Sequence, residues 1–293
     1  MNAVTDATLD TPTQRVEQAF LHACLLDVLA LKPGNVGVHG PGHGMEPVDF
    51  VRSARAAAPA IAAAGVTVGE RIHAAITATR AAVGTNTNLG VVLLAAPLAH
   101  AALQSQWPLS RARLAEGLAQ VLAGLTVADA ELAFEAIRLA NPGGLGDSPR
   151  HDVRAPAQVT LLEAMREAAN RDSIARQYAG AFADVLGTGF ERLAAARAAG
   201  RDRRWSATEV FLEFLCRYPD SHVARKFGPA AAEALRREAC SQAGALRHAG
   251  DTSAMRARLE GWDAALKARG FNPGTSADLT VATLFAGFLL APG

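Results

Sequence analysis

Three carboxylates occupy positions that helical periodicity otherwise gives to apolar side chains: Asp27, Glu135 and Asp172. Each continues a stripe of residues spaced by three or four, as Asp27 does after Phe20 and Ala23. A carboxylate on such a stripe should be buried, and burial is costly unless the group is paired or binds a metal. We therefore expect a partner for each acid.

Two kinds of partner remain open. Arg138 and Arg171 are candidates for structural ion pairs with the nearby acids. Alternatively, the three acids converge on a metal ion or a reacting group, as in bundles that build sites from facing helices, and are then catalytic residues and metal ligands. Asp278, at the start of the last predicted helix, is a fourth candidate metal ligand, although the helix dipole alone favours an acid there.

Four loops of small residues interrupt the apolar segments, at 31–45, 84–90, 141–153 and 271–280. Glycine-rich backbone lets N–H groups approach an anion, and a free helix N-terminus attracts phosphate. None of the loops contains the GxxxxGK[ST] pattern, and none shows GxGxxG after a strand. They predict phosphate binding outside these common motifs, with plain connections between helices as the alternative.

The loop at 31–45 contains five glycines, two prolines and one lysine. Long loops in compact domains are often functional. Its backbone can form an anion nest, to which the lysine would add a point charge. The predicted phosphate contacts are Lys32, Gly34 and Asn35, and the predicted proton carriers are His39 and His43.

The loop at 84–90 reads GTNTNLG and precedes an almost unbroken apolar run. One helix cap needs one Asn or Thr, and four in a row exceed that need. We expect a nucleotide-facing loop, with simple capping as the alternative. The predicted contacts are Thr85, Asn86, Thr87, Asn88 and Gly90.

Basic side chains add to the predicted phosphate site. In the segment RYPDSHVARKFG, Asp220 or Ser221 is expected to cap a helix, which places Arg225 and Lys226 about one turn into it. These two residues and Arg171 are predicted to contact phosphate. A solvated helix face is the alternative.

Helices must position these residues, because strand signals are nearly absent and the chain is rich in alanine, the strongest helix former. The sequence predicts an all-α fold: one multi-helix globular domain over 11–293, of about ten to twelve helices and without significant sheet, after a frayed tail at 1–10. The predicted helices span 11–31, 48–64, 68–83, 88–104, 110–123, 127–140, 156–187, 190–199, 207–217, 222–248, 253–269 and 276–290.

The composition narrows the class of protein. A net charge of +1 over 293 residues argues against a general nucleic-acid binder. The sequence shows neither a signal peptide nor an apolar run of about 18 residues, so we expect no membrane partner. Three widely spaced cysteines without a CxxC pair predict neither a disulfide framework nor a zinc site, which fits a reducing cytoplasm. A homodimer stays open.

Four ordered motifs, spread over roughly 17–290, resemble the triphosphoribosyl-dephospho-CoA synthase family. LLDVLALKPGNV resembles its acid-before-KPG segment, and GTNTNLG resembles its G-x-N-T-x-x-G loop. NRDSIAR resembles its Asp-Thr-Asn segment, with Asp172 as the acid. NPGTSADL resembles its segment that ends in Ala-Asp-Leu, with Asp278 as the acid.

The resemblance implies an all-α transferase that uses ATP as a substrate and Mg²⁺ as a cofactor. In the family reaction, the 2′-hydroxyl of 3′-dephospho-CoA replaces adenine at the anomeric carbon of the ATP ribose, and the triphosphate is kept. This chemistry needs a carboxylate near the anomeric centre, a base for the hydroxyl and a proton for adenine. The buried acids and small-residue loops suit those needs.

The sequence departs from the family at two places. Gly44 stands where the family usually has an acid, and the sector around 135–153 resembles a branch found in archaea and one-carbon-metabolising bacteria. One alternative function is therefore a related nucleotide- or phosphate-dependent transfer in pterin or furan cofactor biosynthesis. A second alternative is a non-catalytic helical scaffold that binds a partner.

Overall fold

The computed structural model describes residues 11–143 and 150–290, and most of these residues lie in helices. Fourteen α-helices and one π-helical turn form in this part, slightly more than the ten to twelve helices predicted. Its strand-like pairings are two isolated bridges, Gly37 with Gly40 and Gly42 with Met45. The all-α prediction is confirmed, whereas the predicted tail at 1–10 lies outside the described residues.

The helices run in chain order as α1 Pro12–Leu29, α2 Pro47–Ala62, α3 Val68–Val83, α4 Leu89–Gln104, α5 Arg111–Ala123, α6 Val127–Ala140, α7 Leu161–Ala168, α8 Ser173–Ala179, the π-helical turn Asp184–Gly189, α9 Phe190–Ala198, α10 Arg203–Arg217, α11 Ser221–Phe227, α12 Pro229–Ala249, α13 Ser253–Ala268 and α14 Gly274–Leu289.

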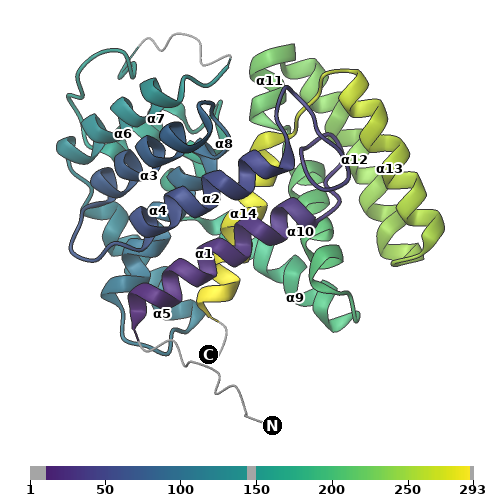
Figure 1. The fold of residues 1–293 in the computed structure, drawn as a ribbon, viewed down its shortest axis with the longest axis horizontal. Coiled ribbons are helices and arrows are strands. Elements are labelled where there is room, and N and C mark those ends of the chain that lie inside the picture. Colours follow the sequence, from purple (N-terminus) through teal and green to yellow (C-terminus); the bar gives the residue numbers. More distant parts are fainter. Residues whose placement is uncertain (1–10, 144–149, 291–293) are drawn as a thin grey trace.

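Helix α14 runs through the middle of the molecule, next to α1 (Figure 1). It packs against α1, α4 and α10, which come from distant parts of the chain. In the view of Figure 1, α2 to α8 lie on one side of this central pair, and α11 to α13 lie on the other. The C-terminal helix is thereby the element around which the two sides assemble.

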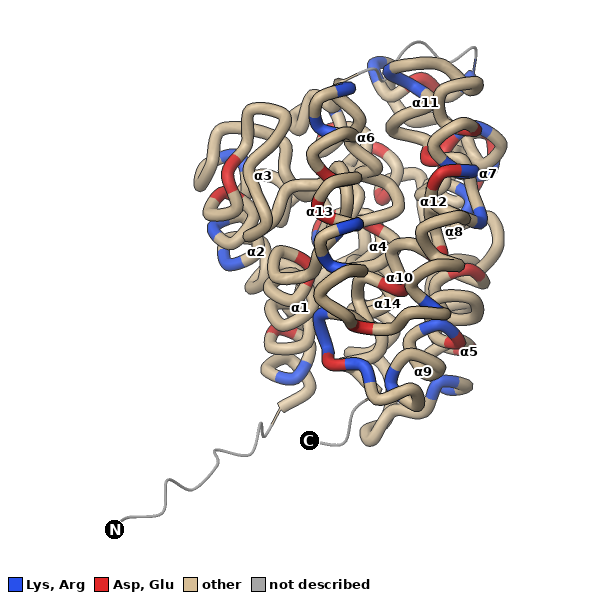
Figure 2. Tube along the Cα trace, turned by 90° about the vertical axis from the view of Figure 1, so that its right-hand side faces the viewer, with Lys and Arg blue, Asp and Glu red and all other residues tan. Residues whose placement is uncertain are grey.

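Two apolar cores stabilise the fold. The larger core includes Leu94 and Phe285, and the smaller one includes Phe211 and Leu259. Helix α4 carries no charged residue, and Asp278 is the single charge on α14. The outer helices carry charges of both signs (Figure 2). Among the described residues, no single helix is long and apolar enough to cross a membrane.

Two long predicted helices are broken by capping residues. The segment 156–187 divides into α7, α8 and the π-helical turn, because the Asp172 carboxylate accepts hydrogen bonds from the backbone N–H groups of Ile174 and Ala175 and starts α8. The segment 222–248 divides at Gly228, whose φ of +89° ends α11 before Pro229 opens α12. A polar cap at the first place and a glycine with positive φ at the second outweigh the continuous alanine-rich pattern.

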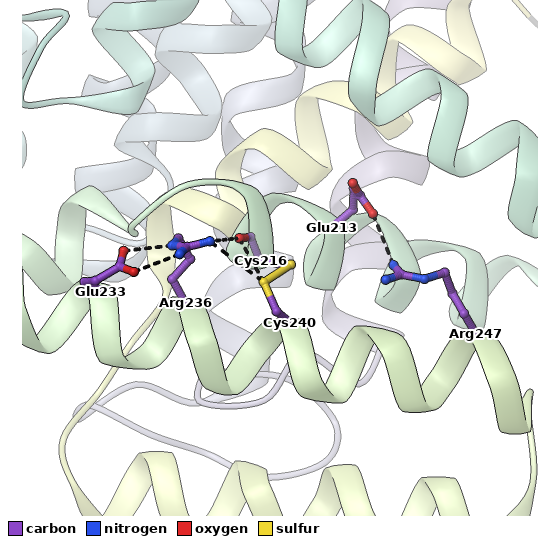
Figure 3. The surroundings of a disulfide bond; sticks show 6 residues. All are labelled: Glu213, Cys216, Glu233, Arg236, Cys240 and Arg247. Atoms are coloured by element: carbon purple, nitrogen blue, oxygen red, sulfur yellow. Dashed lines mark hydrogen bonds and ion pairs between the residues drawn. A yellow bond between two sulfur atoms is a disulfide. The ribbon is translucent and has the colours of Figure 1, made fainter.

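A disulfide joins Cys216 of α10 to Cys240 of α12, a pairing that the wide spacing of the three cysteines did not predict (Figure 3). The two helices pack side by side, and the Cα atoms of the two cysteines lie 4.5 Å apart. The Arg236 guanidinium donates to the backbone carbonyl of Cys216 and forms an ion pair with Glu233. Spacing along the chain does not reveal this contact, because helix packing creates it.

Candidate active site

Three adjoining cavities lie where α14 and α4 meet α1 and α11. The central cavity, about 130 Å³, is lined by Asp27, Asn88 and Asp278 among others. The large cavity, about 310 Å³, has a mostly apolar wall on α6, α7 and α8. The basic cavity, about 290 Å³, is lined by residues that include His43, Arg80, Thr85, Asn141 and Lys226.

The three cavities are parts of one site, because Asn86 and His222 line all of them. Gly90 and Asp278 line both the central and the large cavity. Asn272 lines both the central and the basic cavity. Segments that are distant in the sequence therefore meet at a single junction.

Asp27 faces the central cavity from α1 and is anchored by a buried lysine. The Lys32 ammonium lies 2.6 Å from Asp27 Oδ2 and donates a second hydrogen bond, also 2.6 Å long, to Asn35 Oδ1. Burial raises the pKa of Asp27, and the Lys32 charge opposes that shift. Asp27 Oδ1 is buried without a hydrogen-bond partner. One oxygen of this carboxylate is thus available to a ligand.

This geometry corrects the predicted role of Lys32. Its side chain is 1% exposed, and it lines none of the three cavities. The buried ammonium is held by Asp27 and Asn35 and orients those side chains, which does not support the predicted phosphate contact. The periodicity argument that Asp27 is buried with a partner is confirmed, but the partner is this lysine.

Asp278 projects from α14 toward α4 at the junction of the central and large cavities. A Cβ atom added to Gly90 would lie 2.1 Å from Asp278 Oδ2, so the close approach of the two helices requires glycine there. Burial raises the pKa of Asp278 well above its ordinary value. The Asp220, Asp27 and Asp172 carboxylates raise it further, while the Lys32 ammonium lowers it. Asp278 is therefore a carboxyl group that retains its proton unusually well.

His222 lies in the first turn of α11, two residues after Asp220, whose side chain caps the helix. Its ring nitrogen Nε2 is buried and has no hydrogen-bond partner. Burial lowers its pKa to about 4, with further lowering from the positive charges of Arg225, Lys226 and His43. The ring is uncharged at neutral pH, and an unused nitrogen lies at the meeting point of the three cavities.

The loop at 84–90 does more than cap α4. Asn86 Oδ1 accepts a hydrogen bond from the backbone N–H of Leu89. The Asn88 amide donates to Thr79 Oγ1, while its Oδ1 is buried without a partner. The Thr87 hydroxyl is hydrogen-bonded to that of Ser53. All five residues of this loop that were predicted to contact ligand line at least one cavity: Thr85, Asn86, Thr87, Asn88 and Gly90.

The loop at 31–45 contributes less than predicted. The Gly34 N–H donates to Asp263 Oδ1, and a Cβ atom at Gly34 would lie 2.9 Å from Pro273 Cδ, so this glycine serves packing. His39 is exposed and lines no cavity. His43 lines the basic cavity, but its Nε2 is hydrogen-bonded to the Gly34 carbonyl. The contacts of Gly34 do not support its predicted phosphate role. The exposed position of His39 does not support its predicted role as a proton carrier.

Two of the predicted acids are not brought together with Asp27. The Asp172 carboxylate, at the edge of the large cavity, caps α8 and pairs with Arg225 of α11. Glu135 Oε2 lies 3.6 Å from His73 Nε2, and the side chain of Glu135 is 44% exposed, so the prediction that it is buried is wrong. Glu135 lines none of the three cavities, so the structure does not place it in the site. Both acids belonged to apolar stripes in the sequence, but a helix break and a surface position determined their surroundings.

The predicted basic partners also differ. Arg138 pairs with Glu131 and not with Glu135. Arg171 and Arg225 line the large cavity, and Lys226 lines the basic one. Within the described residues, no group of three or more His, Cys, Asp or Glu side chains could hold a metal ion. The four acidic side chains that were predicted to bind metal therefore do not form one cluster.

The cavity residues that were not predicted include His222, Arg80 and Asn272. His222 follows two potential capping residues beside the basic pair. Asn272 opens the NPGTSADL motif, so the sequence marks the surroundings of both residues. Arg80 lies in the last turn of α3. Asn272 accepts a hydrogen bond from the side-chain amide of Asn35, which is 237 positions away in the sequence. No sequence signal pointed to Arg80, which helix packing brings to the site.

The sequence matches the family described as ATP:dephospho-CoA triphosphoribosyl transferase (CitG) over residues 13–292. Among solved structures, it is similar to a protein from Archaeoglobus fulgidus that is provisionally assigned as a triphosphoribosyl-dephospho-CoA synthase. The two chains share 26% identity with a TM-score of 0.62, and the match covers 81% of this chain and 97% of that one. No curated protein matched the sequence.

Proposed function

The chain belongs to the ATP:dephospho-CoA triphosphoribosyl transferase family, and from that premise we propose that its junction of three cavities performs the family reaction. The reaction transfers the triphosphoribosyl group of ATP to 3′-dephospho-CoA and releases adenine. The single observation that carries this assignment is the meeting of Asp278, His222 and Asn86 where the three cavities join. A two-substrate transfer needs two binding spaces that share one reacting centre.

The linings support a division of the substrates among the cavities. The basic cavity suits the triphosphate, because Arg80 and Lys226 supply positive charge, and Thr85 and Asn141 supply hydrogen-bonding groups. The large cavity suits dephospho-CoA, since its apolar wall fits the pantetheine arm and its Arg171 and Arg225 can meet the diphosphate. The ribose and adenine of ATP then lie in the central cavity.

Asn88 and Asp27 would contact the sugar and its phosphates from α4 and α1. The unpartnered Asn88 Oδ1 is an acceptor for a ribose hydroxyl, because an unsatisfied buried oxygen is stabilised by any donor that reaches it. The unpartnered Asp27 Oδ1 has the ligand chemistry that Mg²⁺ prefers. Mg²⁺ commonly binds through one or two carboxylates and substrate phosphates. Asp27 is thus the residue that would hold it, and the ion would neutralise phosphate charge.

The alternatives considered from the sequence are less well supported. A related transfer in pterin or furan cofactor synthesis finds no support in the family match. A non-catalytic scaffold does not account for three unpartnered polar atoms, on Asp27, Asn88 and His222, in adjoining cavities. We also expect a cytoplasmic enzyme, because its substrates are ATP and a CoA precursor; cell fractionation tests this location.

Product analysis tests the proposed function. The full chain is incubated with ATP, Mg²⁺ and 3′-dephospho-CoA, and the products are measured by mass spectrometry. We expect free adenine together with a dephospho-CoA adduct heavier by one triphosphoribosyl unit. Omission of either substrate should abolish both products. If ATP binds but no adenine appears, the assignment of the acceptor is overturned.

A further inference from the structure

His222 and Asp278 both line the central and the large cavity, where the proposed reaction takes place. His222 lines all three cavities with a buried Nε2 that has no partner. Asp278 is the single charged residue of α14 and lines the two cavities that we assign to the reacting ribose and to the acceptor. A general acid or base must lie within hydrogen-bonding reach of the proton that it transfers.

We propose that His222 and Asp278 are the acid–base pair of the transfer, with His222 Nε2 as the base for the acceptor hydroxyl and the Asp278 carboxyl group as the acid for adenine. This inference rests on the proposed function, because both roles are defined by the bond that is made and the bond that is broken.

The protons and electrons of the step balance. The 2′-oxygen of dephospho-CoA bonds to the anomeric carbon of the ATP ribose as its proton passes to His222 Nε2. The bond from that carbon to adenine N9 breaks, and its electron pair leaves with adenine. The Asp278 carboxyl group supplies the proton that makes the leaving base neutral. The step ends with protonated His222 and ionised Asp278, and solvent returns a proton from the first to the second.

The electrostatic surroundings favour this assignment over its reverse. Burial and the cations Arg225, Lys226 and His43 keep the pKa of His222 near 4, so the ring starts without the proton that a base must accept. Burial and the carboxylates of Asp220, Asp27 and Asp172 raise the pKa of Asp278 despite Lys32, so this group starts with the proton that an acid must donate. Each group is thus held in its uncharged form, in which the histidine can accept a proton and the carboxyl group can donate one.

The histidines predicted from the sequence are poorer candidates. His39 is exposed and lines no cavity. His43 engages the Gly34 carbonyl through Nε2, at 2.9 Å, and lines only the basic cavity of the three. His222 alone of these three has an unused buried nitrogen at the junction.

Two variants and two nucleotides test the pair. The substrates are ATP and 7-methyl-ATP, whose positively charged base leaves without needing a proton. We expect His222→Gln and Asp278→Asn each to lower kcat with ATP by about 100-fold or more, the usual range for general acid–base catalysis. With 7-methyl-ATP, the loss in Asp278→Asn should shrink to less than about tenfold, and the loss in His222→Gln should persist.

The controls separate chemistry from folding and from binding. His100→Gln, a matched change on α4 away from the cavities, should leave kcat unchanged. Thermal unfolding and the ATP dissociation constant are measured for every variant, and His222→Asn replaces the glutamine variant if the latter does not unfold cooperatively. A loss of less than about tenfold with ATP in either variant overturns the pair.

If Asp278→Asn lowered kcat equally with ATP and with 7-methyl-ATP, the role of Asp278 as an acid would also be overturned. Active wild-type protein with unaffected variants contradicts this inference alone. Wild-type protein that releases no adenine in the presence of dephospho-CoA contradicts the proposed function, and this inference with it.

Discussion

At the scale of single residues, the buried ion pair of Asp27 and Lys32 makes a testable contribution to stability. Asp27→Asn leaves the ammonium, which is 1% exposed, without a counter-charge. Removing one partner of a buried pair costs about 3–5 kcal/mol, so the free energy of unfolding in urea should fall by that amount. The double variant Asp27→Asn with Lys32→Met should be more stable than Asp27→Asn alone, because no buried charge remains. A single variant within about 1 kcal/mol of wild type would contradict this account.

Asp278 should lower stability while it serves the reaction. Its folded-state pKa is raised by burial and then by neighbouring carboxylates, so the folded protein binds the proton more tightly than the unfolded chain does. Well below the ordinary pKa of 3.8, both states are protonated and the effect is absent. As the pH rises above that value, the unfolded chain ionises first and the folded state loses relative stability.

Asp278→Asn should therefore be more stable than wild type at pH 8, and the difference should shrink toward zero as the pH falls below about 4. Urea unfolding at several pH values measures both proteins. Asp202→Asn, a change at the exposed cap of α10, provides the comparison for a helix-terminal acid. A variant that is less stable than wild type at pH 8 would show that Asp278 is stabilised in its ionised form.

Sequence periodicity was informative about single residues only where the helix continued. Asp27 is buried with a partner as predicted, because α1 runs without a break from Pro12 to Leu29. Asp172 was assigned to the same kind of stripe, yet it caps a new helix and pairs with Arg225. The choice of ion-pair partner depends on packing between helices, which no local pattern encodes.

At the scale of elements, the crossing of α4 and α14 sets the position of Asp278. Gly90→Ala would place a methyl group 2.1 Å from Asp278 Oδ2, so the carboxyl group must move. A displacement of about 1 Å at a reacting group can cost roughly 100-fold in rate. We expect adenine release to fall by about that factor, with about 1–3 kcal/mol lost in stability.

Gly244→Ala is the matched control for this helix crossing. Gly244 lies in α12, where an added Cβ atom would contact nothing within 4 Å. This change should leave activity unchanged and raise stability by up to about 1 kcal/mol, because alanine is the better helix former. If Gly90→Ala kept wild-type adenine release, the contact between α4 and α14 would not position the acid.

The disulfide between α10 and α12 should stabilise the side of the molecule that carries α11. Cys216 and Cys240 are separated by 24 positions. Closing a loop of that size in the unfolded chain contributes about 3 kcal/mol. Cys216→Ser should lose about that amount in urea unfolding, and a reducing agent should affect wild-type protein but not the variant. Equal sensitivity of the two proteins to the reducing agent would contradict this role.

Local sequence predicted most helices well and two of them poorly. Capping boxes such as Thr11 with Gln14 and Thr67 with Glu70 form at the starts of α1 and α3. The failures are the segments 156–187 and 222–248, where alanine-rich composition hides a cap and a glycine. Helix propensity is continuous along such segments, whereas a break needs only one residue that satisfies the backbone differently.

At the scale of the whole molecule, the site exists only when the fold is complete. Its walls come from α1, the loop before α4, α11 and α14, which are far apart in the sequence. Each of the four family motifs places at least one residue at a cavity, namely Asp27, Asn86, Asp172 and Asp278, but none of the motifs lies in α11. Their relative orientation, and the contribution of His222 from α11, follow from packing around α14.

Because the unfolded chain has no such site, ATP with Mg²⁺ should raise the unfolding temperature of the whole domain. At a ligand concentration of about 100 times the dissociation constant, the gain is about 2.7 kcal/mol, which corresponds to a shift of several degrees. Chelating Mg²⁺ with EDTA should reduce the shift, since Asp27 Oδ1 then has no ion to bind. Asp27→Asn should respond to ATP equally with and without Mg²⁺. Differential scanning calorimetry measures these shifts, and a wild-type protein with neither a shift nor heat of binding would favour the scaffold over the transferase.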